Sequence, residues 1–152
     1  MFSYLCAMAL KKSYDLLEST DPWICVASKL ALSIRTVSAI YRKHLKAHNV
    51  TMSQLSLLMI VGKHKFLPQS EIGRKLMLER STVTRDLKRM IERGYFVKKY
   101  DKSRPVIYIT DKGASYVESI IPDWKAATEE AKAKLGEDGE QALNLVLHKL
   151  TK

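Results

Sequence analysis

The sequence has few of the features that mark secreted or membrane-spanning proteins. Its two cysteines, Cys6 and Cys25, are too few for a disulfide scaffold. No apolar run approaches the roughly 20 residues that a transmembrane helix needs. The opening stretch "MFSYLCAMALKK" places its lysines after the apolar residues, whereas a secretory signal places them before. We therefore expect a cytoplasmic protein without a membrane partner.

Signatures of enzymes are also missing. There is no glycine-rich phosphate loop, no Gly-x-Ser-x-Gly element and no metal-protease helix. His44 and His48 have the spacing of metal ligands on one helix face, but no carboxylate is near in sequence, and Lys43 and Lys46 would repel a cation. We predict no enzymatic activity, no cofactor and no metal site, and only a ligand from another helix would complete a zinc site.

Acidic residues are scarce where basic residues gather. The chain carries a formal net charge of +10, and residues 63–113 hold 14 Lys and Arg against six Asp and Glu. Residues 22–70 contain no Asp or Glu at all. A positive field concentrated in one segment predicts a polyanionic partner, and nucleic acid is the first candidate.

The apolar periodicity predicts one continuous domain, mainly α with a small β-hairpin. "TMSQ" at 51–54 has the form of a capping box, Gly62 is expected to end the helix that it opens, and Pro68 is expected to open the next. Pro122 should bend or break the long helix that follows Thr110. Helices are expected at 2–18, 22–48, 51–61, 68–76, 80–94, 111–135 and after 139, with a single strand pair within 95–110 and its turn at Asp101–Pro105.

The stretch "STVTRDLKRM" at 81–90 is amphipathic. At helical spacing its apolar flank consists of Val83, Leu87 and Met90, continued by Ile91, while hydroxyl and basic side chains point away from it. A short helix precedes it after a tight turn, which is a helix-turn-helix pattern. The second helix of such a motif fits the major groove of DNA, where Arg85 can bind a guanine edge bidentately.

The hairpin after this helix has a cationic tip. Arg104 at the tip is suited to a narrow minor groove, where negative potential is concentrated. A helix-turn-helix followed directly by such a hairpin, inside the most basic part of the chain, predicts contact with adjacent grooves of duplex DNA.

Residues 69–113 resemble the MarR family of winged-helix transcriptional regulators. "STVTR" resembles the start of the family's recognition helix, "RMIERGYF" its exit into the wing, and "DKSR" with "IYITDKG" its wing and the segment after it. The resemblance extends less specifically over about 24–150. It implies a winged helix-turn-helix DNA-binding lobe at 50–110, dimerisation helices at 21–48 and 111–152, and an extra N-terminal helix at 1–20.

The resemblance also implies a function and its residues. It implies an obligate homodimer on a palindromic operator, most simply a repressor released by a small effector. The wing turn is shorter than is usual in the family, and Pro105 directly follows Arg104. The DNA-binding residues that the resemblance implies are Ser81, Thr82, Thr84, Arg85 and Lys88 on the helix and Lys102, Ser103 and Arg104 on the wing.

Three alternatives stay open. The basic, acid-free segment 22–70 predicts either an anionic effector pocket, such as one for an aromatic acid, or simply a stronger field for DNA. Cys25, near a helix start where the dipole favours a thiolate, is a candidate redox switch, although its neighbours Trp23, Ile24 and Val26 favour a buried, inert thiol. The basic hairpin could also bind an acidic protein instead of DNA.

Overall fold

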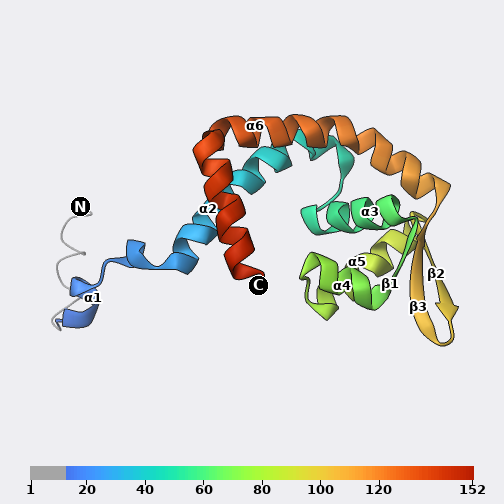
Figure 1. Cartoon of the computed structure of the whole chain (residues 1–152), viewed down its shortest axis with the longest axis horizontal. Coiled ribbons are helices and arrows are strands. Elements are labelled where there is room, and N and C mark those ends of the chain that lie inside the picture. Colours follow the sequence, from blue (N-terminus) through green and yellow to red (C-terminus); the bar gives the residue numbers. More distant parts are fainter. Residues whose placement is uncertain (1–12) are drawn as a thin grey trace, which may run out of the picture. The chain divides into compact units, whose positions relative to one another are not determined.

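The computed structural model describes residues 13–152 of the chain (Figure 1). The helix predicted at 2–18 therefore lies largely outside the described residues, and only α1 (Asp15–Ser19) falls within them. The chain divides into two compact units, one that ends at Val37 and one from Ser38 to Lys152. Within residues 13–152, no helix is long and apolar enough to cross a membrane.

The helix predicted at 22–48 is interrupted. Asp21 caps the 3-10 turn η1 (Pro22–Ile24) by accepting a hydrogen bond from the Trp23 amide at 2.9 Å. The α-helix α2 begins only after Cys25, whose backbone is extended, and runs over Val26–His44. A second 3-10 turn, η2 (Lys46–His48), follows and ends at Asn49, which is in the left-handed conformation.

Helix α3 (Met52–His64) opens with the predicted capping box, in which Thr51 and Gln54 bond each other's backbone. The prediction that Gly62 ends this helix is wrong, because the helix continues to His64. Gly62 lies against β3 instead, where an added Cβ would come within 3.3 Å of Ile109 Cδ1. Its small size therefore serves close packing and not termination.

The sheet has three strands, not the single pair that was predicted. Strands β2 (Phe96–Asp101) and β3 (Arg104–Ile109) form the predicted hairpin, and β1 (Phe66–Pro68) pairs antiparallel with the other edge of β3. The order is β1-β3-β2. Because β1 has only three residues, it is too short to show the alternation of apolar and polar residues by which a strand is predicted.

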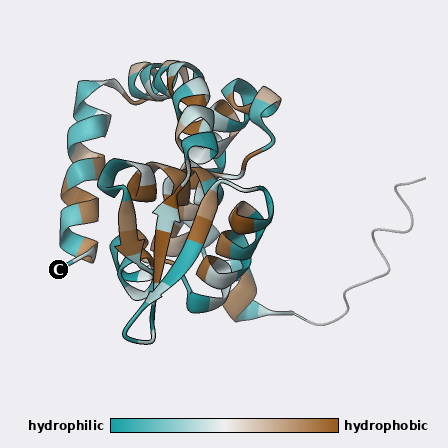
Figure 2. Ribbon diagram, turned by 90° about the vertical axis from the view of Figure 1, so that its right-hand side faces the viewer, coloured by the Kyte–Doolittle hydropathy of each residue, from teal (hydrophilic) through white to brown (hydrophobic). Residues whose placement is uncertain are grey.

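Helices α4 (Gln69–Leu76) and α5 (Arg80–Glu92) form the helix-turn-helix, with Met77 in the left-handed conformation at the turn. The core of the lobe collects apolar residues from all of these elements, and Figure 2 shows them as brown stretches on the strands and the helices beside them. The fully or almost fully buried members include Leu57, Leu58, Val61, Ile72, Met90, Phe96 and Ile107.

Helix α6 (Asp111–Leu150) closes the chain. Thr110 caps it by accepting a hydrogen bond from the Gly113 amide at 3.0 Å. Pro122 lies inside the helix, and the departure from helical dihedral angles is at Gly136 (φ 69°, ψ 172°), the first residue of the predicted break at 136–139. The fold is the predicted class, mainly α with a winged helix-turn-helix.

Candidate nucleic-acid interface

Helix α5 presents the two faces that its sequence predicts. Val83, Leu87 and Met90 are buried in the lobe, and Ile91 is half-buried against the same cluster. On the outer face Ser81, Thr84, Arg85 and Lys88 are exposed, whereas Thr82 is half-buried. The burial of one flank fixes the roll of the helix, so that the hydroxyl and basic side chains face solvent together.

The hairpin of β2 and β3 carries the second group of predicted residues. Its register brings Asp101 opposite Arg104, so the turn consists of only Lys102 and Ser103. Both turn residues have positive φ (44° and 70°), which two-residue turns of the type that matches strand twist require. Lys102, Ser103 and Arg104 are exposed, and Figure 2 shows the hydrophilic colour of the tip.

Asp86, which the sequence analysis did not select, is the one buried charged residue in the described part of the chain, with 2% of its surface exposed. Its Oδ2 accepts a hydrogen bond of 2.6 Å from Ser53 Oγ on α3, and its Oδ1 lies 3.5 Å from Gln54 Nε2. Its Oδ1 also lies 3.8 Å from Arg85 Nε and 3.9 Å from Arg89 Nη1. Buried carboxylates need such hydrogen bonds and countercharges because burial strips them of water.

The position of Asp86 was readable in principle. Residues 83, 86, 87 and 90 follow the i, i+3, i+4, i+7 spacing of a buried helical flank, so the acid falls on the apolar side of α5. Its partners Ser53 and Gln54 come from another helix, and the sequence alone could not bring them together with it.

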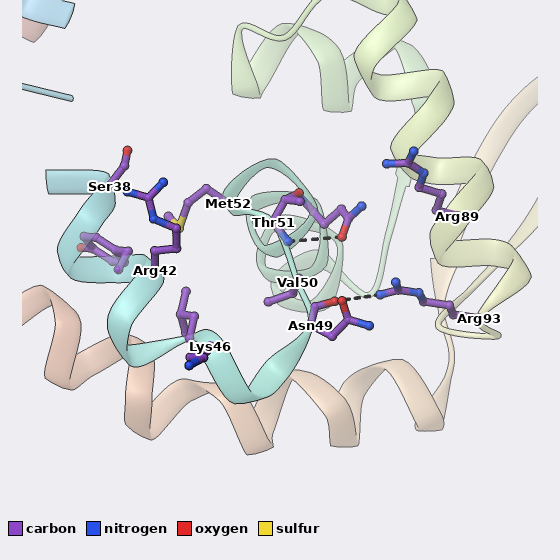
Figure 3. Close-up of a pocket in the computed structure, with 12 residues that line it drawn as sticks. Ser38, Arg42, Lys46, Asn49, Val50, Thr51, Met52, Arg89 and Arg93 are labelled. Carbon is purple, nitrogen blue, oxygen red and sulfur yellow. Dashed lines mark hydrogen bonds between the residues drawn. The ribbon is translucent and has the colours of Figure 1, made fainter. Parts of the chain in front are cut away.

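A cavity of about 640 Å³ lies between the end of α2, the start of α3 and α5 (Figure 3). Arg42 and Lys46 stand on one side of it and Arg89 and Arg93 on the other. The remaining lining residues are uncharged: Ser38, Tyr41, Leu45, Asn49, Val50, Thr51, Met52 and Gln54. The cavity therefore combines four cationic side chains with an apolar and hydroxyl lining, a composition suited to an organic anion.

Two of these four cations already have partners, since Arg89 faces Asp86 and Arg93 binds a backbone oxygen. Arg93 Nη1 donates a hydrogen bond of 3.0 Å to the backbone oxygen of Asn49, which joins α5 to the turn before α3 (Figure 3). Arg42, in the last turn of α2, is exposed. Arg93 thus forms part of the cavity wall through its bond to the backbone. Arg42 does not make this bond.

The two histidines noted in the sequence each face a carboxylate of α6. His44 Nε2 lies 2.7 Å from Glu130 Oε2, and His48 Nε2 lies 2.7 Å from Asp123 Oδ2. The hydrogen bond from His44, followed by that from Lys43, lowers the pKa of the Glu130 carboxyl. Among residues 13–152 no three His, Cys, Asp or Glu side chains converge as metal ligands, and these pairs tie the end of α2 and the turn η2 to α6.

Cys25 differs from its prediction as a buried thiol. It is exposed, and its neighbours Trp23, Ile24 and Val26 are exposed as well. Cys25 stands directly before α2, and its carbonyl oxygen accepts the Lys29 amide at 3.2 Å. A hydrogen bond with the Ser28 side chain lowers the pKa of the thiol, which favours the thiolate.

Comparison with known proteins finds relatives of the winged helix-turn-helix segment. Residues 50–103 match the model of the MarR family. An uncharacterized HTH-type transcriptional regulator of Bacillus cereus is 28% identical over 79 residues, which cover 52% of this chain and 54% of that protein. The chain thus spans about half the length of the curated relatives that it matches first.

Solved structures show the same fold. A MarR variant from E. coli complexed with operator DNA aligns with a TM-score of 0.76 at 18% identity, over 86% of this chain and 99% of that one. BpsR of Bordetella bronchiseptica, whose DNA binding is regulated by 6-hydroxynicotinic acid, aligns with a TM-score of 0.77 at 17% identity, over 86% and 97%. Residues 50–103 thus resemble the MarR family in sequence, and the chain shares the winged helix-turn-helix fold of solved MarR structures.

Proposed function

We propose that this protein is a sequence-specific, double-stranded DNA-binding transcriptional regulator that acts as a homodimer. The observation that carries the proposal is the outer face of α5, where Ser81, Thr84, Arg85 and Lys88 are exposed over a buried apolar flank. Thr82 borders this face, and Lys102, Ser103 and Arg104 extend it onto the hairpin. The fold shared with a structure bound to operator DNA supports the same assignment.

The homodimer is supported by apolar side chains that the single chain leaves in solvent. The last part of α6 exposes Leu143, Val146, Leu147 and Leu150, which follow the i, i+3, i+4, i+7 spacing of one helix face. A stripe of this kind gains stability by packing on another surface, and a second copy would bring its own stripe. Two copies would place two α5 helices for a palindromic operator.

The cavity bounded by Arg42, Lys46, Arg89 and Arg93 is the proposed effector site. Four cations and no carboxylate on its lining favour an anion, and the apolar lining favours an aromatic body. The fold neighbour regulated by 6-hydroxynicotinic acid supports an aromatic acid. The effector would stabilise a dimer in which the α5 helices no longer match grooves one DNA turn apart, so repression would be released.

The DNA-binding proposal is tested with random and selected duplexes at several salt concentrations. We expect affinity for random duplex DNA to fall steeply with salt, because the protein releases condensed counterions when it contacts phosphates. Selection from a random library should then yield a preferred palindromic duplex. A chain that ignores duplex DNA at low ionic strength, or that prefers an acidic protein, would overturn the proposal in favour of a protein-binding module.

The effector proposal is tested by displacement from the selected duplex. We expect 6-hydroxynicotinate and 4-hydroxyphenylacetate to weaken DNA binding more than their neutral amides, because the amides lack the charge that Arg42 and Lys46 would bind. The variant Arg42→Gln should reduce this difference, whereas Lys134→Gln, an exposed cation of α6, should not. Equal effects of acid and amide would contradict an anion site.

A second candidate function follows from the exposure of Cys25 and the lowered pKa of its thiol. A thiolate at this position would react with hydroperoxides and could release the protein from DNA. Peroxide should then weaken DNA binding of the wild type but not of Cys25→Ser. Equal loss in both proteins, or no loss in either, would remove this candidate.

A further inference from the structure

The buried Asp86 carboxylate holds a position between two proposed sites. Its Oδ1 faces Arg85 Nε at 3.8 Å and Arg89 Nη1 at 3.9 Å, while Ser53 Oγ holds its Oδ2 at 2.6 Å. The Ser53 bond anchors the carboxylate to α3, and the two arginines are its charged partners. Both guanidinium groups are more than half exposed, at 60% and 54%.

The two arginines serve different surfaces. Arg85 belongs to the proposed DNA-binding face of α5, and Arg89 lines the cationic cavity (Figure 3). One carboxylate oxygen therefore faces both a residue proposed to read a base and a residue proposed to meet the effector. No other acidic side chain of the described chain is buried between these surfaces.

We propose that Asp86 is a positioning residue through which Arg89 controls how freely Arg85 can contact DNA. While Arg89 faces Oδ1, the negative charge of Asp86 is balanced by two arginines, and Arg85 is held less strongly. When Arg89 turns to an anion in the cavity, the buried charge is balanced by Arg85 alone. Burial strengthens this attraction because few water molecules screen it, and Arg85 is drawn toward its own helix and away from a base.

This inference rests on the proposed DNA binding and deepens it by naming a link between effector and base recognition. A purely structural role for Asp86 is the competing explanation, because Ser53 and Gln54 join α5 to α3 through it. The two explanations differ in one respect. An anchor to α3 would not make the effect of changing Arg89 depend on the charge of Asp86.

A double-mutant cycle measures this dependence without needing the natural effector. Arg89→Gln imitates the loss of Arg89 from Oδ1, and Asp86→Asn keeps the size and the Ser53 hydrogen bond but removes the charge. The readout is selectivity, the ratio of the Kd for random duplex to the Kd for the duplex that the wild-type chain selects from a random library. This ratio cancels changes in general electrostatic attraction, which act on both duplexes.

In the chain that keeps Asp86, we expect Arg89→Gln to lower selectivity by at least about threefold. An effect of this size lies within the range of interaction energies measured between residues in contact. In the Asp86→Asn protein the same change should leave selectivity unaltered, because Arg85 is no longer drawn back. An equal loss in both backgrounds would make Arg89 a direct DNA contact and overturn the inference. So would no loss in either background.

Two controls keep the result interpretable. Glu79→Gln also removes one negative charge beside α5, and its side chain makes no capping hydrogen bond, so Arg89→Gln should retain its full effect in that background. If Asp86→Asn does not fold, a cycle with Arg85→Gln replaces it: Arg89→Gln should then cost no further selectivity, and a persisting loss overturns the inference. A wild-type chain that binds no duplex contradicts the proposed function itself, which is a different result.

Discussion

The lobe around the winged helix and the two ends of the chain differ in how far their apolar side chains are exposed. In the lobe, Leu57, Leu58, Val61 and Ile72 have no exposed surface. Near the ends, Trp23 is 61% and Leu147 57% exposed, although both are at least as large as these four core residues. Among residues 13–152, the lobe thus has a complete core, whereas large apolar side chains near both ends are exposed.

The physical reason lies in how the elements meet. The lobe combines three helices and a three-stranded sheet, so each apolar flank faces another within the same chain. The part of α6 after Gly136 has no buried residue, and neither do α1 and η1. Stability of the lobe should therefore belong to the single chain, and stability of the ends to an assembly.

The largest effect is expected in the core of the lobe. Phe96→Ala should lower the free energy of unfolding by about 3–5 kcal/mol, because it leaves a cavity where a fully buried ring packs. Val97→Ala on the same strand is the matched control, since Val97 is 44% exposed and faces the other side. Chemical denaturation of both variants measures the difference, and similar losses would contradict the burial pattern.

The next effect should appear only in the assembly. Leu147→Lys should weaken self-association by about 1.5–3 kcal/mol, the value of one large apolar side chain removed from water. Sedimentation at several protein concentrations would measure it, with the exposed neighbour His148→Lys as control. If the wild-type chain is a stable monomer, the apolar stripe of α6 must have another partner and the proposed homodimer is wrong.

Within the lobe, the functional surface should be separable from the core. Arg85→Ala should weaken binding to a selected duplex by about 1–3 kcal/mol and relax base preference, because a bidentate base contact is lost. Because Arg85 is also a countercharge of the buried Asp86, the free energy of unfolding is measured in parallel to separate a loss of stability from the loss of a base contact. Equal losses on selected and random duplexes would reduce Arg85 to a phosphate contact.

A smaller effect is expected at the wing. Arg104→Ala should weaken binding to all duplexes and lower the slope of log affinity against log salt by about one, as removal of one phosphate-neutralising cation does. Lys134→Ala, which removes an exposed cation far along α6 in sequence, is the control. Full affinity of the Arg104 variant would show that the two-residue turn does not reach the DNA.

The smallest effect concerns the two ion pairs that Glu130 forms with His44 and with Lys43. Folding lowers the pKa of Glu130 below its ordinary 4.5, so these ion pairs stabilise the fold above pH 4.5. Their contribution to stability is lost as the pH falls through the lowered pKa. The melting temperature of Glu130→Gln should thus lie below that of the wild type at neutral pH and approach it at acidic pH. The neighbouring Glu129→Gln, which leaves both ion pairs of Glu130 in place, is the control for the loss of one negative charge.

Much of the fold was predictable because its signals are local. The capping box at Thr51 and Gln54, the start of the long helix after Thr110 and the two faces of α5 each depend on residues within one or two turns. Gly62 misled the prediction because close packing on Ile109 and helix termination favour the same residue. β1 was missed because its three residues become a strand only by pairing with β3.

The sequence by itself determined the basic, amphipathic helix and the charged hairpin, since charge and helical period are written along the chain. Tertiary structure alone decided that Ser53 and Gln54 of α3 meet the Asp86 carboxylate, that His44 and His48 meet separate carboxylates, and that four cations surround one cavity. These arrangements join residues from helices distant in sequence. Their distances follow from how the apolar flanks pack, and no local pattern encodes that packing.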